Sequence, residues 1–439
     1  MKNLKTFSVV FLVGSILIYN AQSSKEETNI HYRAEASLMP AIKGCVFKTV
    51  FGEESSAFHS SYKTPEKVEH SITDGLNWIA KAQHSGGGWG AGSHARQHII
   101  DPHEVNADPA TTSMVAMAIM RSGSTINSGP YSNQLKKALE YILKEVERSS
   151  QNNNRITDET GTQIQTKLGA NIDAVLATQF LTNIVDELDY DPALKKRVMK
   201  SLNVCVDKVQ NLQASDGRTK GGGWAGVLQS GLANNALEAA QTKGAKVDAA
   251  ILEKSREYQN SNFNAKSGEV NTTDGAGVVL YSVSSSVRAS AKQAREVKED
   301  IAKAKAEGKI EPDAEVSEET LNRIGYSKDK AMKANTSYQV YSSAKTVAQN
   351  DKVIRGFGNN GGEEFLSFLQ TGESMIINKD NDWKNWYDNV SGRLLNIQNN
   401  NGSWNGHHCI TSPVFCTAIS ILILTVNNDI DKLTMIGQN

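Results

Sequence analysis

The sequence predicts an all-α protein whose helices pair into a closed double ring, and three observations lead to this fold class. The pattern Gln-x-x-x-Gly-x-Trp occurs at residues 83–89 and again at 398–404, each time between two helix-like segments. A third copy begins at Gln213 but reaches its tryptophan only at Trp224. Amphipathic segments also alternate with apolar, small-residue segments, and such pairs bury their apolar faces only by stacking on neighbouring pairs.

The amino-terminal 21 residues are predicted to be a signal peptide. Lys2 and Lys5 precede an uncharged apolar run over residues 7–19, and Ala21 provides a small-residue cleavage site. The run is shorter than the ~20 residues that span a bilayer, so no transmembrane segment is expected in the mature chain. We therefore expect a secreted or periplasmic protein, with a retained anchor as the alternative. Residues 22–67 show no period and are expected to form a leader that straps onto the body.

From about residue 68 the chain has the pattern of helices separated by polar, Gly- and Asn-rich loops. Amphipathic helices are predicted at 72–83, 135–146, 193–212, 248–259 and 384–398, and apolar helices at 111–121, 172–184, 230–240, 273–290 and 414–426. Amphipathic helices outside and apolar helices inside form an α/α toroid. This domain is predicted to span residues 68–427, followed by a tail at 428–439.

Two parts of the pattern refine this prediction. Residues from about 290 to 334 interrupt the repeat, and 292–309 carries oppositely charged pairs such as Glu299 and Lys303 at helical spacing. A solvated, charged helical insertion is therefore expected there. Asp108-Pro109 and Ser412-Pro413 each place a capping residue before a proline at the first helical position. Their helices occupy equivalent places in the first and last repeats, which are neighbours in a closed ring.

Composition excludes some partners and leaves the cysteines open. The chain has 47 basic and 48 acidic residues, a net charge of −1, so it lacks the basic footprint of a nucleic-acid-binding protein. Four cysteines are too few for a disulfide scaffold. A bridge between Cys409 and Cys416, or between Cys45 and Cys205, stays open at this point.

These repeats resemble those of the terpenoid-cyclase and protein-prenyltransferase superfamily, which includes the squalene-cyclase-like toroids. The resemblance covers about residues 70–426 without the insertion, and residues 403–406 with 413–418 resemble the closing repeat of that superfamily. It implies the α/α toroid fold. It does not imply an activity, because this toroid hosts unrelated functions.

The sequence lacks the motifs that carry three of the chemistries known in this superfamily. Squalene cyclases protonate their substrate with Asp-x-Asp-Asp, which this chain lacks, and its aromatic content is only 7%. In the zinc-dependent prenyltransferases a histidine stands where this chain has Ser412, and no Asp-x-Cys precedes that position. Residues 361–364, Gly-Gly-Glu-Glu, lack both reacting residues of a complement-type thioester. Neither cyclisation nor the usual prenyl transfer is therefore expected.

Histidines concentrate in two loops that a closed ring would bring to the same mouth. His94, His98 and His103 lie between Trp89 and Asp108, and His407, His408 and Cys409 follow Trp404. Imidazole and thiolate ligands suit zinc, whose bound water is a hydrolytic nucleophile. We predict a zinc site formed by His94, His98, His408 and Cys409, with His103 and His407 as substitutes. The alternative is that these side chains are solvated or cap helices; no other cofactor is expected.

Carboxylates begin several predicted inner helices: Asp108, Asp173, Asp274, Glu363 and Glu364. Asp108 and Asp173 are expected to serve helix amides. Glu363 and Glu364 follow two glycines and are the predicted acid–base pair, one of them with a raised pKa. Asp274 is the third catalytic candidate. Arg96, Trp89 and Trp404 are the candidate ligand-binding residues, with a surface arginine as the alternative for Arg96.

The functional expectation is a secreted toroid protein that binds an exported ligand, a glycan, lipid or peptide, at the mouth of the ring. Hydrolysis or lyase chemistry, with zinc, is the first hypothesis. A non-catalytic binding or assembly scaffold is the alternative, as is an isoprenoid or lipid binder without cyclase activity. Catalysis predicts convergent site residues and perturbed carboxylates in a pocket, whereas a scaffold predicts scattered histidines and a filled centre.

Overall fold

The computed structural model describes residues 62–358 and 360–435, and within them the protein is helical. The strands found there are β1 (Phe263–Asn264) and β2 (Glu269–Val270), which pair antiparallel in a short ribbon. The all-α prediction is therefore confirmed. The predicted signal peptide and most of the predicted leader lie outside the described residues.

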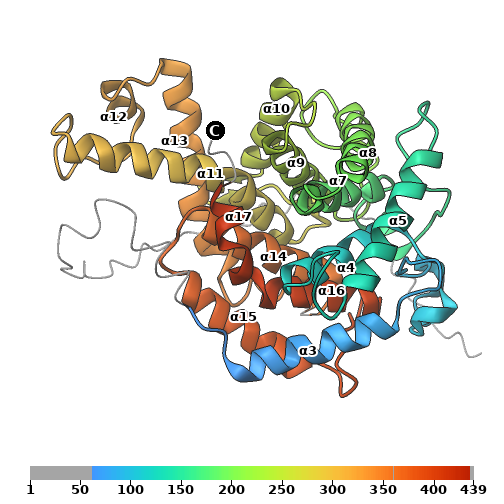
Figure 1. The fold of residues 1–439 in the computed structure, drawn as a ribbon. Coiled ribbons are helices and arrows are strands. Elements are labelled where there is room, and N and C mark those ends of the chain that lie inside the picture. The colour runs from blue at the N-terminus through green and yellow to red at the C-terminus, as the bar shows by residue number, and fades with distance from the viewer. Residues whose placement is uncertain (1–61, 359, 436–439) are drawn as a thin grey trace, which may run out of the picture.

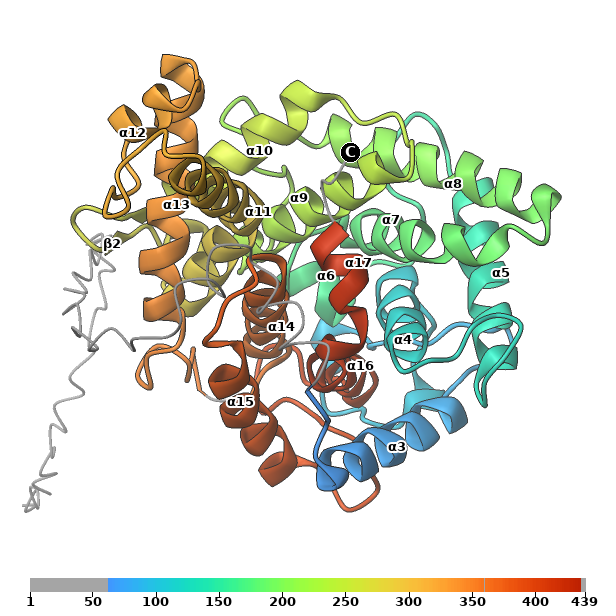
Figure 2. The same cartoon turned by 60° about the vertical axis from the view of Figure 1, so that its left-hand side comes forward.

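Six apolar helices form a closed inner ring (Figures 1 and 2). In chain order they are α4 (Pro109–Arg121), α7 (Ile172–Ile184), α9 (Gly226–Thr242), α11 (Val279–Ala306), α14 (Gly362–Ile377) and α16 (Pro413–Leu424). Each packs against the next, and α16 packs against α4. Every residue of α4 is buried, as expected of a helix surrounded by other helices.

Six helices, all but α13 amphipathic, form the outer layer: α3 (Glu66–Lys81), α5 (Ser132–Arg148), α8 (Pro192–Asn211), α10 (Ala249–Ser261), α13 (Lys328–Ala348) and α15 (Trp383–Ile397). Outer and inner helices alternate along the chain, so all inner helices run in the same direction. This is the α/α toroid that the repeats predict. The pair α13 and α14 completes the ring, although the sequence pattern predicted no bounds for either helix and indicated only the start of α14, at Glu363 and Glu364.

Shorter helices occupy the connections. They are α6 (Gln163–Lys167), α12 (Glu318–Arg323), α17 (Ile430–Met435) and 3₁₀ turns at His94–Arg96, Pro102–Glu104, Val185–Leu188, Thr273–Gly275 and Val426–Asp429. The predicted insertion is helical, but α11 runs unbroken through residue 290 and projects from the ring. It packs with α12 and α13 around a small separate core that includes Val297, Ile301 and Leu321.

The glutamine of each repeat motif ties successive outer helices together. Gln83 Nε2 donates to the carbonyls of Gly87, at 2.8 Å, and Gln134, at 2.9 Å, beside the start of α5. Gln398 Nε2 donates at 2.9 Å to Gly402 O and to Ser71 O in α3. The last outer helix is thus joined to the first, and the motif closes the outer ring.

The glycine of the motif is required by its backbone. Gly87 and Gly402 have φ values of 95° and 90°, a left-handed conformation that side chains disfavour. A Cβ at Gly87 would lie 2.5 Å from Lys137 O, and one at Gly402 would lie 2.7 Å from Asp74 O. The close approach of the loop to the next outer helix therefore needs glycine.

Trp89 and Trp404 are structural rather than ligand-binding residues. Both are fully buried. Their indole Nε1 atoms donate to carbonyls of the preceding outer helices, Ile79 O at 2.9 Å and Leu394 O at 2.8 Å. Because neither ring is open to solvent and both donors are used, the predicted ligand-binding role of these two residues is corrected.

The carboxy-terminal segment covers the mouth at which the inner helices end (Figure 2). Arg121, the last residue of α4, donates from Nε to Asp429 Oδ2 at 2.6 Å and from Nη2 to Glu373 Oε1 at 2.7 Å. The described residues after 427 therefore form part of the packed body, with α17 against α14.

Loss of the Asp429 contact tests this attachment. We expect Asp429→Asn to lower the free energy of unfolding by about 1.5–3 kcal/mol, because a buried guanidinium loses a charged hydrogen-bond partner. Chemical denaturation measures the change. Asp431→Asn is the matched control, since Asp431 is exposed in the same segment and should leave stability within about 0.5 kcal/mol. Equal stability of the two variants would contradict a clamping role for Asp429.

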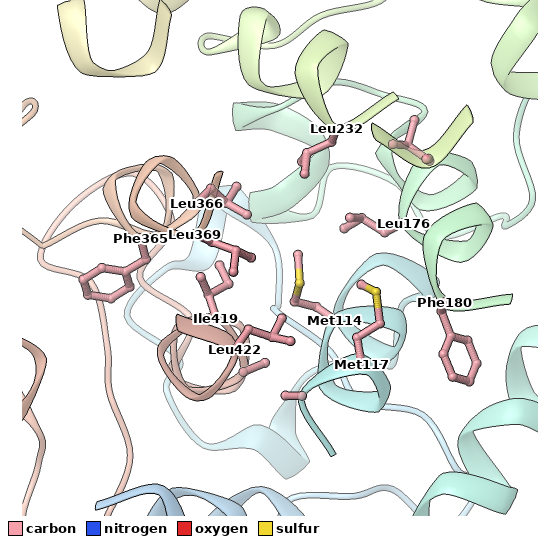
Figure 3. Packing of buried hydrophobic residues seen from close by; sticks show 14 of the residues in the cluster. Met114, Met117, Leu176, Phe180, Leu232, Phe365, Leu366, Leu369, Ile419 and Leu422 are labelled. Atoms are coloured by element: carbon pink, nitrogen blue, oxygen red, sulfur yellow. The ribbon is translucent and has the colours of Figure 1, made fainter. Parts of the chain in front are cut away.

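The centre of the ring is nearly filled. Side chains of the inner helices, among them Met114, Leu232 and Leu369, point toward one another there (Figure 3). They leave a cavity of about 80 Å³, far below the ~300–1,000 Å³ of ligand pockets. Its lining also includes charged and amide groups of Arg121, Gln179, Asn183, Arg288 and Glu373. This central cavity, as the described residues line it, is therefore too small for an isoprenoid chain.

Candidate functional site at the amino-terminal mouth

The loops before the inner helices meet at the opposite end of the ring, which we call the amino-terminal mouth. The loop after Trp89 is joined to α6, where Gln163 N donates to Gly92 O at 2.9 Å. Gln163 Oε1 accepts from Thr411 N at 2.7 Å, which joins α6 to the closing loop. Gly362 N donates to Ile410 O at 3.1 Å, which adds the start of α14. The first and last repeats are therefore side by side, as the sequence predicts.

Asp108 and Asp173 organise the helix starts at this mouth. Asp108 caps α4 by accepting from Thr111 N at 2.7 Å, and its second oxygen accepts from Ala91 N at 2.9 Å. Asp173 accepts from Ala110 N at 3.1 Å, so it serves the first turn of α4. Burial raises the pKa of Asp108 to about 7 and that of Asp173 to about 6. Since their oxygens accept from backbone amides and from the Thr111 and Gln165 side chains, both act as structural residues.

Glu363 and Glu364 lie buried in the first turn of α14 and have different surroundings. Glu364 Oε1 accepts from Tyr281 Oη at 2.7 Å and from Phe357 N at 2.8 Å. Glu363 Oε2 accepts a longer bond of 3.3 Å from Ile410 N. Desolvation, with a smaller contribution from the neighbouring charge of Glu364, raises the pKa of Glu363 to about 8. Glu363 is therefore protonated at neutral pH, as the predicted acid of the pair should be.

The backbone before α14 packs directly on this pair. A Cβ at Gly356 would lie 2.5 Å from Glu364 Oε1, and one at Gly361 would lie 2.6 Å from Glu364 Oε2 and 2.9 Å from His408 Cε1. A larger residue at either position would displace the carboxyl group. The two glycines therefore allow Glu364 and His408 to lie against the same stretch of chain.

Several polar atoms at this mouth are buried without a protein partner. They are Glu364 Oε2, His408 Nδ1 and Nε2, Gln163 Nε2 and His94 Nδ1. Buried polar groups normally form hydrogen bonds, and exceptions call for an explanation by ligand, water or function. Their presence on the segments that surround the carboxyl pair makes this mouth the candidate functional site.

Lys167 adds a buried cation to the site. It ends α6, is 4% exposed, and places Nζ 4.1 Å from the ring centroid of Trp224. Burial, and to a smaller extent the Lys167 ammonium, lowers the pKa of His94. Burial raises the pKa of Cys409 to about 11, and the same ammonium opposes this rise. Lys167 therefore faces both side chains, and the Cys409 thiol is neutral at physiological pH.

The structure does not assemble the predicted zinc ligands. Among the described residues, no group of three or more His, Cys, Asp or Glu side chains is placed to hold a metal ion. His94 and His408 are half-buried, but His98 is exposed, because residues 94–96 form a 3₁₀ turn that ends before an α-helical i, i+4 face can form. The substitutes His103 and His407 are exposed as well. His94 and His98 therefore do not share one face of an α-helix.

Zinc itself stays a prediction from the sequence, which metal content tests directly. The protein purified without chelator is compared with His408→Ala by plasma mass spectrometry. Near-stoichiometric zinc that the variant loses would support the site, whereas metal-free protein in both samples would exclude it. The described cysteines Cys205, Cys409 and Cys416 are free thiols, so Cys409 and Cys416 do not form the bridge that the sequence left open.

Asp274 and Arg96 lie apart from the carboxyl pair. Asp274 accepts from Tyr258 Oη at 2.6 Å and lies 3.6 Å from the Arg218 guanidinium. It lines a separate pocket of about 450 Å³ beside the glycine run 221–223. Arg96 is exposed in the first loop. The structure therefore does not join Asp274 to the two glutamates, and Arg96 keeps its alternative reading as a surface residue.

A groove of about 750 Å³ lies on the outside of the ring between α10 and α13. Its charged side chains neutralise one another, since Lys333 lies 2.6 Å from Glu257 and 3.2 Å from Glu253. Among its described lining residues, no carboxyl oxygen is buried without a hydrogen-bond partner. Size alone therefore does not make this groove the better candidate site.

Sequence reasoning missed four residues of the mouth: Gln163, Lys167, Trp224 and Tyr281. One signal was available for Trp224, because the third motif copy reaches its tryptophan late. That tryptophan is 64% exposed, whereas Trp89 and Trp404 are fully buried. The longer spacing in the third copy of the motif thus marks the repeat whose tryptophan is exposed instead of buried in the core.

Comparison with known proteins adds little. No protein-family model matches the chain, and no curated protein matches it. Among solved structures, a glycosidase variant is similar at 13% identity and a TM-score of 0.44, over 83% of this chain and 97% of that chain. A likeness this distant carries no argument about function.

No single helix among the described residues is both long and apolar enough to cross a membrane. The pair of α16 and the segment Val426–Thr434, bent by 61°, passes the same criteria only in combination.

The raised pKa of Glu363 predicts how stability changes with pH. Between its ordinary value of 4.5 and about 8, the folded protein holds a proton that the unfolded chain has released. The free energy of unfolding should therefore fall as pH rises through this range, and Asp108 acts in the same direction. Urea denaturation at pH 5.5 and 8.5 measures the difference, expected to be on the order of 2 kcal/mol. Glu363→Gln should reduce it; an unchanged difference would contradict the assignment.

Proposed function

We propose that the protein is a glycoside hydrolase whose active site is the amino-terminal mouth, with Glu363 as the general acid. The observation that supports this most strongly is the burial of Glu363, which raises its pKa to about 8, beside a second carboxyl with different partners. Glycoside hydrolysis requires two carboxyl groups, one acting as a general acid and the other as a base or nucleophile, and different environments can assign these two roles.

The two glutamates take complementary roles in this proposal. Glu363 donates its proton to the oxygen of the departing sugar. Glu364 keeps Oε1 bound to Tyr281 and Phe357, while its buried Oε2 accepts no hydrogen bond from the protein. That oxygen is suited to take the proton of an attacking water.

The surroundings favour a sugar substrate and hydrolysis. Trp224 and Phe357 are 64% and 66% exposed at this mouth, and aromatic rings of this kind stack on the apolar faces of sugars. Among the described residues, Tyr281 is the tyrosine whose hydroxyl donates a hydrogen bond to the glutamate pair, at Glu364 Oε1. Burial, together with the nearby carboxylates, raises the pKa of Tyr281 far above its ordinary value. An elimination that uses a tyrosinate base is therefore disfavoured.

A non-catalytic scaffold is the second candidate, supported by the filled centre and the dispersed histidines. Release of reducing ends from a panel of soluble polysaccharides and bacterial cell-wall glycans decides between the two. The proposal expects hydrolysis of at least one glycan by the native chain and none by Glu363→Gln. Binding without hydrolysis by the native chain would favour the scaffold.

A further inference from the structure

The cation at the amino-terminal mouth indicates the kind of glycan that the site takes. Lys167 is 4% exposed, and a buried ammonium is unfavourable unless it is paired. Among the described residues its surroundings include the Trp224 ring at 4.1 Å, Cys409, His94 and Glu363. No described carboxylate lies within ion-pair distance of its ammonium.

The two nearby carboxyl groups are engaged elsewhere. Glu363 accepts from Ile410 N, and Glu364 accepts from the Tyr281 hydroxyl and the Phe357 amide. The site therefore presents a positive charge without a counter-charge in contact, at a mouth where substrate would enter.

A second donor lies on the same short helix. Gln163 is fully buried and precedes Lys167 by one helical turn, so both residues lie on one face of α6. Its Oε1 is used by Thr411 N and Ser412 N, but Nε2 has no protein acceptor. A ligand with two acceptor oxygens would satisfy both the ammonium and the amide.

Trp224 supplies the surface for the sugar ring. Lys167 lies over the indole, yet the side chain is 64% exposed, so most of the indole stays open to solvent. A pyranose stacked there would bring a ring substituent to the ammonium.

We propose that the substrate is an acidic glycan, in which a carboxylate or sulfate of one sugar binds Lys167 and Gln163 while its ring stacks on Trp224. This inference rests on the proposed function, because it treats the mouth as a glycan site. It assigns Lys167 as the specificity-determining residue and Trp224 as the stacking platform.

Binding to a printed array of neutral, uronate-containing and sulfated oligosaccharides tests it. Glu363→Gln is used so that bound glycans persist. We expect binding to acidic oligosaccharides at least tenfold tighter than to their neutral counterparts, and the uronate and sulfate arms distinguish the two anions. Equal binding of neutral oligosaccharides, or no binding at all, would overturn the proposal.

Variants of Lys167 test whether its positive charge, and not a change in folding, causes the preference for acidic oligosaccharides. Lys167→Met in the Glu363→Gln background should lose the tenfold preference, and Lys167→Arg should retain it. Lys330→Met is the matched control, because Lys330 Nζ lies 4.2 Å from the Tyr326 ring in the insertion and should change nothing. If Lys167→Met does not fold, Trp224→Ala decides, since loss of an exposed ring should abolish binding. Acid-selective binding together with no hydrolysis by the native chain would disprove the proposed reaction and leave this inference standing.

Discussion

Replacing Glu363 by glutamine is expected to lower kcat on the glycan substrate by about 10²–10⁴-fold, the usual contribution of a general acid. The amide keeps the size of the side chain but carries no transferable proton. Native activity should also fall as pH rises through about 8, because the acid then loses its proton. Initial rates measured from pH 5 to 10 for the native chain give this profile.

Two comparisons make that prediction specific. Glu319→Gln is the matched control, since Glu319 is exposed in the insertion and should leave kcat unchanged. Thermal unfolding should show that Glu363→Gln is folded, since the amide keeps the size of the side chain and an oxygen that can accept from Ile410 N. A variant with native kcat, or a native pH profile without a limb near 8, would contradict the role of Glu363.

The second large effect concerns stability. Trp404→Ala should lower the free energy of unfolding by about 3–5 kcal/mol, the usual loss for a large aromatic residue replaced in a core. The fully buried ring would leave a cavity between α15 and α16, and Leu394 O would lose its donor. Urea denaturation with fluorescence detection measures this change.

Trp224→Ala is the internal comparison for Trp404→Ala. Its indole is exposed and contacts Lys167, so its removal should change stability by less than about 1 kcal/mol. It should nevertheless weaken glycan binding. If both variants destabilise the protein equally, the third tryptophan has the same structural role as the others.

The ring could be predicted because its repeat motif is local. Gln398, Gly402 and Trp404 act within one loop and its adjoining helices, so their spacing is fixed in the sequence. The α13–α14 pair escaped prediction for a physical reason as well. In α13 the buried positions are largely small or polar, such as Ala334 and Ser337, so no apolar period distinguishes it.

The candidate site was predicted only in part. Glu363 and Glu364 were found because they follow two glycines at an expected helix start. Gln163 and Lys167, in the short connecting helix α6, and Tyr281, in α11, were not, because none of them has a local pattern of its own. The histidines were grouped into one site because their loops were expected at the same mouth of the ring. The backbone of a loop decides where its side chains point, and after the 3₁₀ turn at His94–Arg96 the side chain of His98 is exposed.

The sequence by itself determined the helical class, the double ring and the meeting of the first and last repeats, because periodicity and repeated turns are encoded residue by residue. Only the tertiary structure decided which carboxyl is protonated and which cation lacks a partner. Those properties arise from burial and from neighbours as far apart in the chain as Lys167 and Cys409. Electrostatic environment depends on distance in space, which ring closure sets and local sequence does not.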